Sequence, residues 1–130
     1  NVPEALRIVQ ELRKGRFSHK PISGDRLRPG FLDTLGVVYT KMNKGALYGE
    51  MRDVFAAARQ RYPHDPRMYM YLGHAYAGLL ETDRAQQLYA SAVEIARKKG
   101  QQYLSPEKCQ AVIAEVEAAQ KKIKETAQLP

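Results

Sequence analysis

Residues 66–99, PRMYMYLGHAYAGLLETDRAQQLYASAVEIARKK, read as two amphipathic helices joined by a short polar turn. Apolar side chains recur at intervals of three and four residues, which is the spacing of one helix face. The dipeptide Asp65-Pro66 is typical of a helix N-cap followed by proline at the first helical position. The Asp83-x-x-Gln86 pattern resembles a capping box at the start of the second helix. The stretch therefore predicts a helical hairpin, with helices over about 67–80 and 83–99.

A Leu-Gly-x-x-Tyr pattern occurs twice, 37 residues apart, as Leu35-Gly36-Val37-Val38-Tyr39 and Leu72-Gly73-His74-Ala75-Tyr76. Each glycine lies seven positions after a proline. A glycine inside a helix costs about 1 kcal/mol relative to alanine, so its recurrence indicates a close contact between helices. The pattern predicts two tandem hairpins, over 29–65 and 66–100, which form a core by stacking on each other.

At these residues the chain resembles the tetratricopeptide repeat (TPR) family. That family has Leu, Gly and Tyr on the first helix of each hairpin, and Ala, an aromatic residue and Ala on the second. The matching residues are Leu35, Gly36 and Tyr39 in the first hairpin and Leu72, Gly73, Tyr76, Ala85, Tyr89 and Ala92 in the second. We expect the alanines to supply the small surface that faces the glycine. The resemblance implies an all-α fold, a TPR-like α-solenoid of about two full repeats.

The remaining segments extend this plan at both ends of the chain. Residues 1–14 predict a helix similar to the second helix of a preceding repeat. Residues 15–28 form a basic loop that has no counterpart in the family. Residues 105–126 predict a C-terminal helix with one apolar and one polar side, which suits a cap on the last repeat. We therefore expect a single TPR-like domain over 1–130, as a piece of a larger TPR protein.

Composition and charge exclude several classes of protein. The chain has 130 residues, 44% of them hydrophobic and 27% charged, which is an ordinary globular mixture. The lone Cys109 excludes an internal disulfide. No apolar run is long enough for a membrane span. No signal peptide is visible, which favours the cytoplasm slightly but leaves the compartment open.

The resemblance also predicts where a partner binds. In the family, the first helices of the stacked hairpins line a concave groove, and here they place Lys41, Arg67, Met70, Tyr71 and His74 in it. Helix 67–80 is apolar nearly all round, so it either lends one face to a ligand or is buried on every side. The alternative is that Met70 and Tyr71 pack against the helix predicted over 1–14 or against the C-terminal helix predicted over 105–126. We expect a protein or peptide partner, and the cations Lys41 and Arg67 favour an acidic one.

The sequence contains no pattern that predicts a catalytic site, a metal site or a cofactor. The three histidines share no helical spacing, and no nucleophile with a general base stands out. A subgroup of the family binds C-terminal carboxylates through Lys and Asn, but Asp33, Val37, Met70 and His74 occupy those positions. We therefore expect a non-catalytic protein-binding module without a carboxylate clamp.

Two alternatives from other classes remain. The first is a nucleic-acid-binding helical-repeat module that uses the basic N-terminal region, since 21 Lys and Arg against 14 acids give a net charge of +7. We disfavour it because Phe17 is the one aromatic residue in the basic loop. The second is a homo-oligomeric scaffold segment whose ends stack on other copies.

Overall fold

The computed structural model describes residues 23–43 and 45–127, and this part of the chain is all-α. The elements are η1 (Gly24–Arg26), α2 (Pro29–Met42), α3 (Gly45–Arg61), α4 (Pro66–Gly78), α5 (Thr82–Arg97), η2 (Lys99–Gln102) and α6 (Pro106–Ala127). The predicted all-α class is confirmed for these residues. The helix predicted over 1–14, and most of the basic loop predicted over 15–28, lie outside the described residues.

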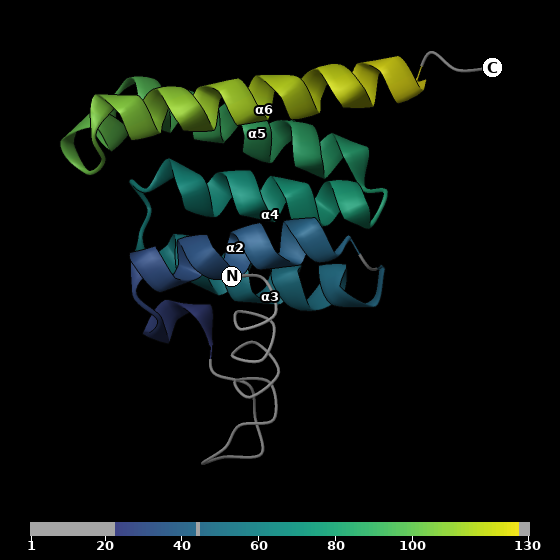
Figure 1. Ribbon diagram of the computed structural model, residues 1–130, viewed down its shortest axis with the longest axis horizontal. Helices are drawn as coiled ribbons and strands as arrows, with labels where there is room; N and C mark the ends of the chain where they lie inside the picture. Colours follow the sequence, from purple (N-terminus) through teal and green to yellow (C-terminus); the bar gives the residue numbers. More distant parts are fainter. Residues whose placement is uncertain (1–22, 44, 128–130) are drawn as a thin grey trace.

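The α-helices of the described residues lie side by side, and successive helices run in opposite directions (Figure 1). α2 and α3 form one end of the stack and α6 the other. α4 lies at the centre, because it packs against α3 and α5 and also against α2 and α6. The central helix is accordingly the most buried, and eight of its thirteen residues are buried.

Proline begins α2, α4 and α6, where its missing N–H costs no helical hydrogen bond. The N-cap predicted at Asp65 is present, since its carboxylate accepts a hydrogen bond from the backbone N–H of Arg67 at 3.0 Å. Ser105 has the same function in α6, where its Oγ accepts from the N–H of Lys108 at 3.2 Å.

The capping box predicted at Asp83 and Gln86 is wrong. α5 begins at Thr82, and its N-cap Glu81 makes no side-chain cap bond. The reason is the end of α4: Leu80 adopts a left-handed conformation with φ of 63°, and the N–H of Glu81 returns to the carbonyl of Tyr76. This tight reversal brings the chain directly into α5 and leaves no extended residue at Asp83.

The two mid-helix glycines do make close contacts, but the nearest side chain to each is an aromatic ring rather than an alanine. A Cβ at Gly73 would lie 2.6 Å from the ring of Tyr89 on α5, within the same hairpin. A Cβ at Gly36 would lie 2.5 Å from the ring of Tyr71 on α4, in the next hairpin. The expectation that alanines face the glycines is therefore corrected, although Ala85 and Ala92 are fully buried.

The remaining residues of the repeated pattern divide between core and surface. Leu35, Leu72 and Tyr39 are buried, and the hydroxyl of Tyr39 donates to Glu50. Tyr76 is partly exposed, with the guanidinium of Arg84 5.7 Å from its ring centroid. The two tyrosines of the repeated pattern are therefore not equivalent in the folded chain.

The C-terminal helix covers α5 and part of α4 with one apolar side. Val112 and Val116 join the main core, while Cys109 and Ile113 form a smaller cluster with Ala96 of α5. Its other side is exposed and carries mainly charged and polar residues. None of the helices in residues 23–43 and 45–127 is apolar over enough length to traverse a membrane.

Candidate functional site

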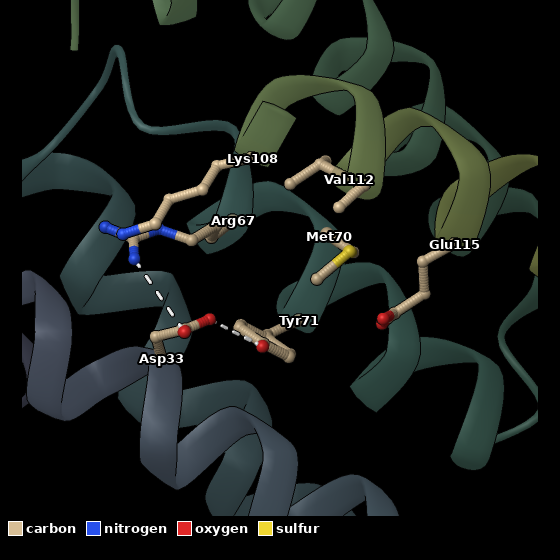
Figure 2. A pocket seen from close by; sticks show the side chains of 8 residues that line it. Asp33, Arg67, Met70, Tyr71, Lys108, Val112 and Glu115 are labelled. Carbon is tan, nitrogen blue, oxygen red and sulfur yellow. Dashed lines mark hydrogen bonds and ion pairs between the residues drawn. The ribbon is translucent and has the colours of Figure 1, made fainter. Parts of the chain in front are cut away.

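A pocket of about 160 Å³ opens between α2, α4 and α6, the three helices that begin with proline (Figure 2). Its lining consists of Asp33 from α2, of Arg67, Met70 and Tyr71 from α4, and of Lys108, Ala111, Val112 and Glu115 from α6. This volume is below the roughly 300–1,000 Å³ of sites for drug-sized ligands. The pocket therefore suits a single side chain better than a cofactor.

Met70 and Tyr71 form the floor of the pocket and are only 3% and 4% exposed. The ring of Tyr71 lies against Gly36, where no side chain intervenes, and 5.1 Å from the ring of Phe55 between centroids. Its hydroxyl donates to Asp33 Oδ1 at 2.7 Å. Met70 and Tyr71 are thus buried among the helices for most of their surface, but the close contacts of Tyr71 are with α2 and α3, which the alternative did not name.

The phenol of Tyr71 keeps its proton throughout the neutral range. Burial raises its pKa far above the ordinary value, and the hydrogen bond to the Asp33 carboxylate raises it further. Asp33 thereby has one oxygen engaged by a fixed donor, while its side chain remains 40% exposed. The floor of the pocket and the wall on α2 form one connected unit.

Arg67 is not the free cation that the sequence suggested. Its Nε and Nη2 donate to the two oxygens of the fully buried Asp65, at 3.0 and 2.7 Å, and its Nη1 lies 3.8 Å from Asp33 Oδ2. Burial works to lower the pKa of Arg67, but the hydrogen bonds and the charge of Asp65 outweigh it and raise the pKa. The guanidinium is therefore balanced by internal partners, which weakens the argument for an acidic ligand.

His74 supports the wall on α6 without lining the pocket. Its Nδ1 lies 2.6 Å from the hydroxyl of Tyr89, and its Nε2 lies 2.7 Å from Oε2 of Glu115. Burial raises the pKa of Tyr89, so its hydroxyl remains a donor to Nδ1. A proton on Nε2 satisfies the contact with Glu115, and the tautomer that carries it there leaves Nδ1 free to accept from Tyr89. His74 thus orients Glu115 at the pocket.

The fifth predicted residue, Lys41, is exposed near the end of α2 and does not line the pocket. Of the five predicted residues, the structure brings Arg67, Met70 and Tyr71 together, and His74 reaches the pocket only through Glu115.

Sequence reasoning missed the contribution of α6 to the pocket, although a signal for it exists. Counted from the proline that opens each helix, buried or partly buried residues follow at the third, sixth and tenth positions. These residues are Leu32, Leu35 and Tyr39 in α2, Tyr69, Leu72 and Tyr76 in α4, and Cys109, Val112 and Val116 in α6. α6 therefore shares its spacing of buried residues with α2 and α4.

Comparison of the chain with protein-family models, with curated proteins and with solved structures found no match. Within the described residues, no three His, Cys, Asp or Glu side chains are grouped as a metal site would require.

Proposed function

We propose that this chain is a non-catalytic protein-binding module built from TPR-like tandem hairpins and belonging to a larger TPR protein. In this arrangement α2 and α4 are the first helices of two successive hairpins, and α6 is a capping helix in the position of the next first helix. A peptide or a partner helix would bind in the groove that these three helices line. The observation that carries the proposal is the position of the pocket between these three helices.

The lining has the composition of a peptide-binding surface. Met70, Tyr71 and Val112 supply an apolar base, and charged side chains surround it. Val37 lies one helical turn beyond Asp33 on α2 and is 39% exposed, so apolar surface continues past the pocket. An apolar centre with a polar rim is common in protein interfaces, and methionine and tyrosine adapt well to peptides.

The test is a selection of binders from a random peptide library displayed on phage, with the full chain as bait. Selected peptides are then measured against Ala111→Trp, which fills the pocket, and Ala114→Trp, an equally large change at an exposed site on α6 that does not line it. We expect binding to weaken about tenfold or more with the first variant and to remain with the second. Equal binding to both variants, or failure to select any peptide, would contradict the proposal.

A further inference from the structure

We propose that the pocket between α2, α4 and α6 binds a basic side chain, lysine or arginine, of the partner segment. This inference rests on the proposed function and names the chemistry that the pocket recognises. It reverses the sign of the ligand charge that the sequence suggested. The partner is thus a peptide or helix that presents one cation to the pocket between the carboxylates of Asp33 and Glu115.

The charges around the pocket do not cancel once the internal pairs are assigned. Arg67 pairs closely with the fully buried Asp65, at 2.7 Å, and more distantly with Asp33, at 3.8 Å, so this group of one cation and two carboxylates keeps one negative charge. Asp33 and Glu115 then face the pocket with one cation, Lys108, on the same lining. Lys108 makes no ion pair with any residue in 23–43 or 45–127. The balance at the pocket is one net negative charge.

The two carboxylates stand on different sides of the apolar floor. Asp33 projects from α2 and Glu115 from α6, with Tyr71 and Met70 between them (Figure 2). Their side chains are 40% and 51% exposed, so a ligand can reach them from solvent. Each accepts a hydrogen bond from an internal donor, Tyr71 or His74, that holds it in place.

Both carboxylates retain capacity for a ligand. A carboxylate offers about four lone-pair sites, whereas an ammonium carries three donors and a guanidinium five. The methylene stem of lysine or arginine would pack on Met70, Tyr71 and Val112, as long basic side chains do on apolar surface. An acidic ligand would find one exposed cation, Lys108, and two carboxylates that repel it.

Lys108 allows the sign of the ligand's charge to be tested. Its side chain extends from α6 over the end of the pocket where Arg67 lies (Figure 2). Lys108→Gln removes a positive charge that would repel a basic ligand and attract an acidic one. The same substitution is therefore expected to strengthen binding of a basic peptide about two- to threefold.

The experiment uses the peptides selected by the full chain, measured at low and high salt. Asp33→Asn combined with Glu115→Gln removes both charges but leaves acceptors for Tyr71 and His74, so the fold is preserved. Glu117→Gln, an exposed site on α6 that does not line the pocket, is the matched control. We expect selected peptides to contain Lys or Arg, the double variant to bind about tenfold more weakly, and the control to bind normally.

The outcomes separate this inference from the proposed function. Peptides that lose binding to Ala111→Trp, but are acidic and weakened by Lys108→Gln, would overturn the basic-side-chain assignment and leave the groove in place. Apolar peptides indifferent to the double variant would do the same. Peptides that bind Ala111→Trp normally would overturn both proposals. Circular dichroism of each variant confirms that a loss of binding is not a loss of folding.

Discussion

A methyl group at position 36 would clash with the ring of Tyr71, which forms part of the pocket floor. The Cβ of Gly36→Ala would lie 2.5 Å from Cγ, Cδ1 and Cδ2 of Tyr71, about 1 Å inside the optimal carbon–carbon distance. These atoms are at the base of the ring, and Asp33 holds the hydroxyl at the other end, so the ring cannot swing aside. Overpacking of this kind costs about 1–3 kcal/mol.

The helix itself would favour the same substitution. Alanine is better than glycine in a helix interior by about 1 kcal/mol, which offsets part of the overpacking. With the cost near the top of its range, we expect Gly36→Ala to lower the free energy of unfolding by about 1–2 kcal/mol. The assay is urea unfolding followed by far-ultraviolet circular dichroism, with the midpoint and the slope fitted separately.

Alanine substitutions at two other glycines serve as controls for the size of the stability loss. Gly73→Ala would meet the edge of the Tyr89 ring at 2.6 and 2.7 Å, which can yield more easily, so its loss should be smaller. Gly30→Ala has nothing within 4 Å and should leave stability unchanged or raise it by up to about 1 kcal/mol. If Gly36→Ala proves as stable as the parent chain, the close contact between Gly36 and the ring of Tyr71 is refuted.

Three further measurements test other contacts. Asp65→Ala would leave the buried Arg67 with only its longer contact to Asp33, at 3.8 Å, and should cost about 3–5 kcal/mol in urea unfolding. Asp53→Ala at an exposed site should stay within about 0.5 kcal/mol, and a loss below 1 kcal/mol at Asp65 would refute the buried pair. Burial raises the pKa of Tyr71 and of Tyr89. Above pH 10 the unfolded chain therefore loses protons that the native chain keeps, and the free energy of unfolding falls with rising pH, by about 1.4 kcal/mol per pH unit for each tyrosine. The share of the phenolate absorbance at 295 nm that belongs to Tyr71 and Tyr89 should appear only when the chain unfolds, and ionisation of every tyrosine near pH 10 in the folded chain would contradict this. Deletion of residues 105–130 should expose the apolar side of α5 and cause aggregation detected by light scattering, so a monomer of unchanged melting temperature would show that α6 is dispensable.

Much of the fold could be predicted because local signals agree with the tertiary structure. The prolines at 29 and 66 open helices where the repeat pattern expects them, and Asp65 caps α4 as its side chain predicts. The start of α5 could not be predicted from Asp83. The left-handed conformation of Leu80 reverses the chain after α4, so that α5 already begins at Thr82. Leucine rarely adopts this conformation, so its presence is a property of the folded turn.

The candidate site was predicted only in part, for a physical reason. The surplus of apolar residues on α4 indicates that the helix has several neighbours, but it does not say whether Met70 and Tyr71 face a ligand or α6. Asp65 is close to Arg67 in sequence, yet only the folded chain shows that the cap carboxylate also receives the guanidinium. Glu115 lies on another helix, 41 residues after His74 in the sequence, so no local pattern could pair them.

The order of the stack has a consequence for how the molecule responds to force. Each helix makes its extensive contacts with helices one or two places away along the chain, and such local topology favours rapid folding. A force applied to the two ends of the chain would therefore separate the helices one after another. α6 packs on α4, α5 and η2 at one end of the stack, so if tension detaches it we expect it to dock again within milliseconds when the tension is released.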